Sequence, residues 1–184
     1  GLALRPKLAS LRCSETNPSV LDCFEKSKRD QESRLEDLCP VEMTVADAED
    51  AVHEDCAGAD VLIVDPPRKG LCEGVREALV KGELGVKRLV YVSCGFDALE
   101  RDQAALLNSR RWKLAHAEAH VFFPGSDHVE TLAVYDAGGP LLLLVLSAIA
   151  ARWLQVLSDD AKCRSASLHG DTLKALCAWN GVYA

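Results

Sequence analysis

The chain has 184 residues, of which 48% are hydrophobic and 27% charged, and its formal net charge at pH 7 is −7. This length and composition are typical of a globular protein with a single aliphatic core, since only 5% of the residues are aromatic. The first residues lack the apolar core of a signal peptide, and the chain begins at Gly1 without an initiator methionine. We therefore expect a fragment or an incomplete gene model.

The eight cysteines never form a C-x-x-C pair, the spacing that is typical of zinc and iron–sulfur sites. We therefore expect no metal in this portion of the protein. Free thiols in a reducing compartment are the expected state. This indicates an intracellular protein but does not distinguish the cytoplasm from an organelle.

The negative net charge argues at first against a nucleic-acid partner, because phosphate contacts draw on lysine and arginine. The cations are unevenly distributed, however. Residues 66–113 carry ten lysines and arginines against six acids, whereas residues 15–65 carry four against fifteen. The positive block is compatible with a polyanion on one side of the molecule, and an ordinary solvated surface is the alternative.

The amino-terminal third predicts little regular structure before its first helix. Residues 1–18 show no periodicity and contain two prolines, so we expect them to be irregular. Ser19–Leu38 has a helix-forming, charged composition that ends before Pro40. Val41–Asp47 alternates apolar and polar residues, which predicts a strand that ends at an acid. Asp47 is then either a ligand-facing carboxylate or the N-cap of the acidic run that follows it.

The stretch Val61–Asp65 (VLIVD) predicts a short strand buried on both faces, as in a parallel sheet. Pro66 and Pro67 end it, because proline cannot donate to the ladder. Asp65 therefore lies at the carboxyl end of the strand, the edge at which open α/β sheets bind ligands. The alternative is that Asp65 only caps a turn.

The rest of this region predicts an α/β fold. The expected elements are a helix over Glu73–Lys81, a strand over Lys87–Cys94, a helix that Asp97 opens, and strands over Ala115–Phe123 and Thr131–Tyr135. The alternation of strands and helices, with a short final connection between two strands, predicts a mostly parallel sheet whose last strand is antiparallel.

The composition changes at the breaker Gly138-Gly139-Pro140. The apolar run Leu141–Ala151 that follows is too short to cross a bilayer, which takes about 20 residues. We expect a docked helix or a non-native tail, and no membrane association. Three regions are therefore predicted: an irregular and helical segment 1–40, a catalytic α/β region 41–137, and an additional tail 138–184.

Three strand ends carry side chains that can take part in catalysis or binding: Asp65 with Arg68, then Cys94, then Glu130 in the loop before the last strand. A cysteine at the carboxyl end of a buried strand, close to the start of the next helix, is in a position that favours the nucleophilic thiolate. A carboxylate across the same cleft can serve as general base. The alternatives are a buried, unreactive cysteine at Cys94 and an Arg68 that only pairs with an acid.

Three stretches, DPPRKG (Asp65–Gly70), LVYVSCG (Leu89–Gly95) and FFPGSDHVE (Phe122–Glu130), together closely resemble the RNA uracil-5-methyltransferases. These are class I enzymes that use S-adenosylmethionine to make 5-methyluridine in tRNA and rRNA. The resemblance implies a Rossmann-like fold, S-adenosyl-L-methionine as cofactor, and RNA as partner.

The resemblance also implies roles for individual residues. The motif cysteine, which matches Cys94, attacks C6 of the uracil, and the motif glutamate, which matches Glu130, removes the C5 proton. The motif aspartate, which matches Asp65, contacts the methyl donor, and Asp47 matches an acid that commonly lies near the adenosine. Arg68 is the candidate to hold a uracil oxygen or a phosphate, because its guanidinium can bind in a bidentate manner.

The sequence departs from the family in two ways. The resemblance covers residues 41–136, about the second half of the catalytic domain, and we find neither a G-x-G loop after a strand nor the acidic strand end that holds ribose hydroxyls. Residue 95 is glycine where many members have asparagine. We therefore expect a sheet that lacks its first strands, and we retain as the alternative a non-catalytic remnant or interaction module.

Overall fold

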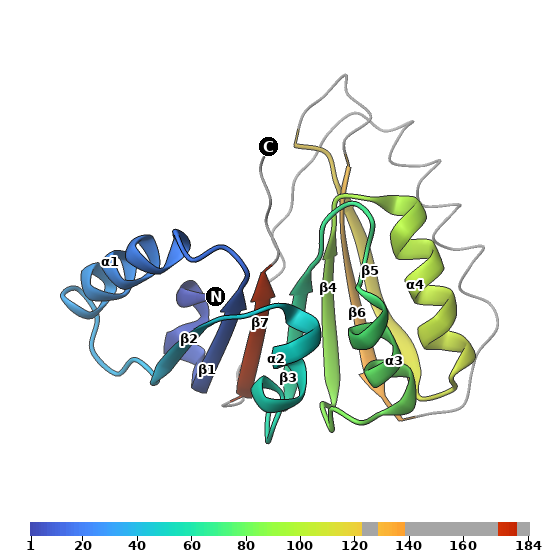
Figure 1. The fold of residues 1–184 in the computed structure, drawn as a ribbon, viewed down its shortest axis with the longest axis horizontal. Helices are drawn as coiled ribbons and strands as arrows, with labels where there is room; N and C mark the ends of the chain where they lie inside the picture. The colour runs from blue at the N-terminus through green and yellow to red at the C-terminus, as the bar shows by residue number, and fades with distance from the viewer. Residues whose placement is uncertain (123–128, 139–172, 180–184) are drawn as a thin grey trace.

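The computed structural model describes residues 1–122, 129–138 and the strand 173–179 (Figure 1). These ranges form one seven-stranded sheet in the order β2-β1-β7-β3-β4-β6-β5. The strands are β1 (Leu8–Glu15), β2 (Val41–Val45), β3 (Val61–Asp65), β4 (Arg88–Ser93), β5 (Trp112–His120), β6 (Glu130–Ala137) and β7 (Leu173–Trp179). The helices are η1 (Leu2–Lys7, a 3-10 helix), α1 (Val20–Glu32), α2 (Ala48–Asp55), α3 (Glu73–Lys81) and α4 (Phe96–Asn108).

The strand directions confirm the expected fold class. β1 pairs in parallel with β2 and β7, and β3 pairs in parallel with β4 and β7. Only β6 runs against its neighbours β4 and β5 among the strands that the structure describes. The sheet is therefore mostly parallel, with one antiparallel strand inserted between two others, as expected for a Rossmann-like fold.

Local sequence determines the bounds of β3 and α3, which agree with the prediction. The strand β3 ends at Asp65, where the two prolines follow. The helix α3 ends at Gly82, which adopts φ = 74° and caps the helix in the left-handed conformation that glycine tolerates best. Because these stop signals are adjacent in sequence to what they stop, pattern alone is sufficient to locate them.

The main core lies between one face of the sheet and the helices α2, α3 and α4 (Figure 1). Leu62, Leu79, Leu89 and Leu106 are completely inaccessible to solvent in it. A smaller cluster packs Leu11 and its neighbours in β1 and β2 against residues of η1 and α1. The α/β core therefore rests on aliphatic packing, as the low aromatic content indicates.

The expectation of irregular structure over residues 1–18 is wrong for most of that segment. Leu8–Glu15 forms β1, an interior strand that pairs with both β2 and β7. The two prolines of the segment flank this strand: Pro6 lies in η1 and Pro18 precedes α1. The prolines delimit the strand without interrupting its ladder, which explains why reading them as breakers was misleading.

The region 138–184 was expected to be an additional helical or non-native tail, and the apolar run Leu141–Ala151 lies outside the described residues. What the structure describes of the region beyond Gly138 is the strand β7. It lies in the interior of the sheet, between β1 and β3 (Figure 1). The boundaries of the three predicted regions stay a prediction.

Candidate active site

The structure brings Asp65, Cys94 and Glu130 to one edge of the sheet. Asp65 is the last residue of β3, and Cys94 directly follows β4, the strand beside it. Glu130 begins β6 on the other side of β4. In the β4–β6 ladder Ser93 is paired with Thr131, so Cys94 and Glu130 each lie one residue beyond the same pair. Sequence motifs that are 36 residues apart therefore meet across one ladder.

A tight turn holds the backbone around Cys94. The Ser93 hydroxyl donates to the carbonyl oxygen of Gly95 at 3.0 Å and accepts from the Gly95 amide at 3.2 Å. Ser93 is buried, whereas Cys94 is partly exposed. The helix α4 starts immediately afterwards at Phe96. The turn thus keeps the sulfur at the open edge of the sheet and at the amino end of a helix.

Gly95 lets this turn approach the segment that carries Arg68. A Cβ atom built at residue 95 would lie 2.5 Å from the carbonyl oxygen of Arg68 and 3.1 Å from its Cα. The obstacle is backbone, which cannot rotate away as a side chain can. The glycine at residue 95 therefore permits a close contact between the two motif segments.

The side chains of the first motif differ in exposure. Asp65 is partly buried and Arg68 is exposed, and both take part in polar interactions in the structure. Gly70 closes the segment with φ = 84°, a left-handed conformation that strains other residues. Glu130 is also partly buried. His128 and the other residues of the third motif from 123 to 128 lie outside the described residues.

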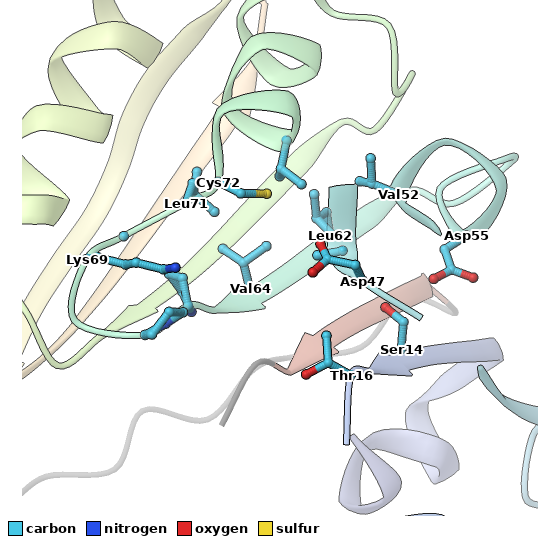
Figure 2. Close-up of a pocket in the computed structure, with 15 residues that line it drawn as sticks. Ser14, Thr16, Asp47, Val52, Asp55, Leu62, Val64, Lys69, Leu71 and Cys72 are labelled. Carbon is cyan, nitrogen blue, oxygen red and sulfur yellow. The ribbon is translucent and has the colours of Figure 1, made fainter. Parts of the chain in front are cut away.

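A pocket of about 200 Å³ lies beside these residues at the carboxyl ends of β1 and β3. Figure 2 shows Ser14 and Thr16 on one side of it, Lys69 and Cys72 on another, and Asp47 and Asp55 from the α2 region. The lining contains Pro66 and Pro67 of the first motif, but neither Cys94 nor Glu130 belongs to it. The pocket therefore adjoins the edge at which the cysteine and the glutamate meet.

Asp47 combines the two alternatives that the sequence left open. It is the N-cap of α2, where its carboxylate accepts a 3.0 Å hydrogen bond from the amide of Glu49. It also lines the pocket (Figure 2). It lies two residues beyond β2, so the predicted strand ends slightly earlier than expected. Capping accounts for one of its oxygens and leaves its pocket-facing position intact.

Asp55, at the carboxyl end of α2, is a buried acid with an unpaired oxygen. Its side chain lines the pocket, and its Oδ2 atom has no hydrogen-bond partner within the described part of the chain. Burial raises the pKa of Asp55 above its ordinary value, and a hydrogen bond with Ser14 only partly offsets this. The pocket therefore contains one acceptor that the protein itself leaves unused.

Among the cysteines that the structure describes, all six are free thiols: Cys13, Cys23, Cys39, Cys56, Cys72 and Cys94. Cys72 also lies near the site, in the pocket lining, but burial raises the pKa of its thiol. Burial and the charge of Asp55 raise the pKa of Cys56 to about 12. Both groups are therefore poor nucleophiles, since the thiolate is the reactive form.

Within the described ranges no three His, Cys, Asp or Glu side chains are grouped so that they can hold a metal ion. The same ranges contain no helix that is long and apolar enough to span a bilayer.

Sequence reasoning missed Glu15, the acid at the carboxyl end of β1. Its side chain is 1% exposed, and its Oε1 atom accepts 3.1 Å hydrogen bonds from the Thr16 hydroxyl and the Asn17 amide. The structure therefore contains an acid at a strand end that the sequence analysis did not find. The signal was available in LASLRCSE, where an acid ends an interrupted alternation, but it depended on recognising the strand.

Comparison with known proteins gives partial matches to RNA methyltransferases. The chain is 35% identical over 136 residues to an uncharacterized RNA methyltransferase of Protochlamydia amoebophila. It is 40% identical over 95 residues to RlmD, the 23S rRNA (uracil(1939)-C(5))-methyltransferase, of Acidithiobacillus ferrooxidans. The two matches involve 74% and 50% of this chain. No family model matches the chain.

The chain spans only a part of these relatives, 34% of the first protein and 21% of the second. Among solved structures, a candidate tRNA (m1A22) methyltransferase of Streptococcus pneumoniae superposes with a TM-score of 0.49 at 12% identity, covering 84% of this chain and 80% of the other.

Proposed function

We propose that the chain is part of an S-adenosylmethionine-dependent enzyme of the RNA uracil-5-methyltransferase family, which forms 5-methyluridine in tRNA or rRNA, and its partial matches to RNA methyltransferases support this. The observation that carries the proposal is the meeting of Cys94 and Glu130 across the β4–β6 ladder, one residue beyond the Ser93–Thr131 pair. A nucleophile and a base on opposite sides of one ladder are what substitution at uracil C5 requires.

Cys94 is the nucleophile in this proposal. Uracil C5 is too weakly nucleophilic to take a methyl group from a sulfonium ion directly. When the Cys94 thiolate adds to C6, the electron pair of the C5–C6 double bond becomes available at C5, and one difficult step is divided into easier ones. Cys94 is partly exposed, on a turn at the start of α4. A uracil ring that approaches from the solvent side can therefore reach its sulfur.

Glu130 is the general base. After C5 has taken the methyl group it still carries a proton, and a base must remove it. The electron pair of that C–H bond then restores the double bond and expels the Cys94 thiolate, so that the enzyme is regenerated. A carboxylate in a partly buried position suits this task, because reduced solvation raises its affinity for a proton.

Arg68 and Asp65 form the third wall of the proposed uracil site. The exposed Arg68 offers a guanidinium that can bind a uracil oxygen or a phosphate in a bidentate manner. Asp65 ends β3 beside the pocket, where it can accept hydrogen bonds from the substrate or the donor. The excess of cations over acids in residues 66–113 is consistent with an RNA backbone approaching from this side.

The pocket fits a part of the methyl donor. Its acids Asp47 and Asp55, with the unpaired Oδ2 of the latter, can accept hydrogen bonds from an adenosine, and its apolar side chains can pack against an adenine ring. Its volume of about 200 Å³ is below the roughly 300–1,000 Å³ of sites that enclose a whole ligand. When bound, the donor supplies an electrophilic methyl group on a sulfonium. This chain's residues would hold its nucleoside end.

A second candidate function is a non-catalytic module derived from such an enzyme. One observation favours it: the described pocket is small for a complete donor site. In that case the sheet edge would be retained as a folded surface without turnover.

Covalent trapping distinguishes the two candidates. The chain is incubated with a short RNA that contains 5-fluorouridine, in the presence and absence of S-adenosylmethionine, and is then denatured. A catalytic chain should yield an adduct that survives denaturing electrophoresis, with the RNA bonded to the tryptic peptide that contains Cys94. Fluorine at C5 cannot be abstracted as a proton, so the methylated adduct cannot release its thiolate.

Cys94→Ala should abolish the adduct, and Cys72→Ala, which removes the other thiol near the site, should not. An absence of adduct from the unaltered chain, with its fold verified by circular dichroism, would contradict the catalytic proposal and favour the non-catalytic module.

A further inference from the structure

A fully buried carboxylate, Asp102, lies behind the candidate site and is not part of the proposed chemistry. It is on α4, its side chain is 0% exposed, and its two oxygens accept hydrogen bonds from different elements. The Oδ2 atom accepts from the Leu71 amide at 2.8 Å and from the Tyr91 hydroxyl at 2.9 Å. One acceptor atom therefore joins the segment after β3 to the strand β4 that leads to Cys94.

The other oxygen of Asp102 is paired with cations. Its Oδ1 atom accepts from Arg101 Nη2 at 2.7 Å and Nε at 3.0 Å, and Arg76 Nη1 lies at 3.4 Å. The buried charge is thus neutralised, which a carboxylate removed from water requires. Burial and the Asp102 charge raise the pKa of Tyr91, so the Tyr91 hydroxyl keeps the proton that it donates.

Arg101 extends this network to the first motif. Its Nη2 atom also donates to the carbonyl oxygen of Lys69 at 2.8 Å, the residue after Arg68. About half of the Arg101 side chain is exposed, so the contact lies at the surface while Asp102 lies beneath it. The guanidinium bridges α4 and the motif segment in a geometry that its planar fork favours.

The backbone contacts at two glycines show how closely these parts are fitted. A Cβ atom at Gly70 would lie 2.5 Å from Asp102 Oδ2 and 2.6 Å from Arg101 Nη2. A Cβ atom at Gly95 would lie 2.5 Å from the Arg68 carbonyl oxygen. The segment 66–71 is therefore packed against α4 at Gly70 and against the Cys94 turn at Arg68.

We propose that Asp102 and Arg101 act as positioning residues that hold the segment 66–71 against the start of α4 and so set the location of Arg68 relative to Cys94. The inference rests on the proposed function for its catalytic consequence, but the mechanical link itself does not depend on it. Neither residue touches the reacting atoms in this account. They act through the backbone of Lys69 and Leu71.

The test measures uridine C5 exchange and backbone protection in the same variants of the full chain. RNA labelled with tritium at uridine C5 is incubated without methyl donor, and tritium released into water is followed as a function of RNA concentration. Arg101→Ala removes the bond to Lys69, and Arg101→Lys retains a cation that can restore part of it. Asp102→Asn removes the buried charge. Amide hydrogen exchange is measured for peptides that cover residues 66–71.

Arg88→Ala is the matched control. Arg88 is exposed to a similar degree and makes an equally short bridge, 2.7 Å from Nε to Asp136 Oδ1, but at the amino end of β4, away from Cys94. It should leave both release and the exchange of residues 66–71 unchanged. A general loss of stability would instead affect the control and the test variants alike.

We expect Arg101→Ala to lower the maximal rate of tritium release by roughly tenfold, with the half-saturating RNA concentration changed less than about twofold, since small misplacements of catalytic groups cost rate. Arg101→Lys should recover part of the rate. The amides of residues 66–71 should exchange faster in Arg101→Ala and Asp102→Asn.

Two results would overturn the inference. One is unchanged exchange of residues 66–71 in Arg101→Ala and Asp102→Asn. The other is an increased half-saturating RNA concentration at an unchanged maximal rate, which would make Arg101 an RNA contact. An unaltered chain that releases no tritium would contradict the proposed function instead, and the amide exchange would still decide whether the positioning link exists.

Discussion

Two buried aspartates show how differently single residues are accommodated in this chain. Asp102 is surrounded by two guanidinium groups, an amide and a hydroxyl, so that its charge is fully compensated. Asp55 is 6% exposed, and its Oδ2 atom has no partner among the described residues. The first arrangement stabilises a charge inside the fold, whereas the second leaves a charge that the fold tolerates at a cost.

Asp55→Asn should therefore stabilise the protein at neutral pH. The pKa of Asp55 is raised in the folded state, so the folded form disfavours the carboxylate, and this penalty is present above that pKa and disappears as the carboxyl is protonated. We expect a gain of about 1 kcal/mol at pH 7, equivalent to about 2–4 °C in Tm for a chain of this size. Thermal unfolding followed by circular dichroism measures it.

The same variant should show no gain at about pH 3, where the native carboxyl is already protonated. Glu100→Gln, an exposed acid on α4, serves as the control and should change stability by less than about 0.5 kcal/mol at both pH values. Destabilisation by Asp55→Asn at pH 7 would show that the carboxylate has a partner that the fold requires.

At the scale of elements, the site depends on two short segments that approach each other through their backbones. The turn at Gly95 lies against Arg68, and the segment after Arg68 is fastened to α4 by Asp102. Neither contact involves regular hydrogen bonding between strands. The relative placement of the first and second motifs is therefore controlled by steric fit at a glycine and by one buried acid.

Gly95→Ala should disturb this fit. The added methyl group would meet the Arg68 carbonyl at 2.5 Å, and relieving the contact requires the two segments to move apart. We expect a loss of about 1–3 kcal/mol in unfolding free energy, the usual cost of overpacking, measured by chemical denaturation.

Gly74→Ala provides the comparison, because its methyl group would meet only the side chain of Glu49, which is exposed and can turn away. Alanine also suits the helical position of residue 74 better than glycine does. If Gly95→Ala proved as stable as Gly74→Ala, the close approach of the two motif segments would not be a property of the folded protein in solution.

The elements that sequence predicts well are those with local boundaries. β3 stops at two prolines and α3 stops at Gly82, so both were located without tertiary information. β1 was missed because Pro6 and Pro18 resemble breakers until the strand between them is seen to pair on both sides. Glu15 was missed with it, since its significance depends on which strand it ends.

The residues of the candidate site could be identified from the sequence, but the residue that positions them could not. The motifs identified Asp65, Arg68, Cys94 and Glu130 as the residues to consider, because each lies at a predicted strand end. The role of Asp102 was not predictable, because two of its donors, Leu71 and Tyr91, come from parts of the chain outside α4. An acid in the middle of an amphipathic helix is ordinarily exposed, and only tertiary structure shows that this one is not.

At the scale of the whole molecule, the sheet is completed by its last described strand. β7 pairs in parallel with β1 on one side and with β3 on the other, so the β1–β2 part of the sheet is joined to the β3–β4–β6–β5 part through it (Figure 1). A segment remote in sequence from both neighbours thus occupies an interior position of the sheet. When β7 pairs with β1 and β3, it closes long loops of the chain. Closing long loops costs conformational entropy and slows folding.

Leu176→Pro should disrupt this interior strand. Position 176 is opposite Arg12 of β1 and Leu62 of β3, and proline there removes a ladder amide that an interior strand requires. We expect a loss of about 3 kcal/mol or more and a broader unfolding transition, measured by denaturant titration.

Leu176→Val keeps the amide and favours extended structure, so it should remain close to the unaltered protein in stability. Equal stability of Leu176→Pro and Leu176→Val would contradict the placement of β7 as an interior strand between β1 and β3.

The central claim is that Cys94 and Glu130 carry out covalent chemistry at a uridine ring, and the release of tritium from RNA labelled at uridine C5 tests it most directly. Addition of the Cys94 thiolate to C6 makes C5 basic. A solvent proton can then be taken up there, and the label is removed by Glu130 before the thiolate leaves. This exchange needs no methyl group, so it depends only on residues that the structure places at one edge of the sheet.

We predict release by the unaltered chain, no release by Cys94→Ala, and release slowed by roughly a hundredfold or more in Glu130→Gln, the usual scale for the loss of a general base. Release that persists in Cys94→Ala, or an unaltered and folded chain that releases no tritium, would contradict the account.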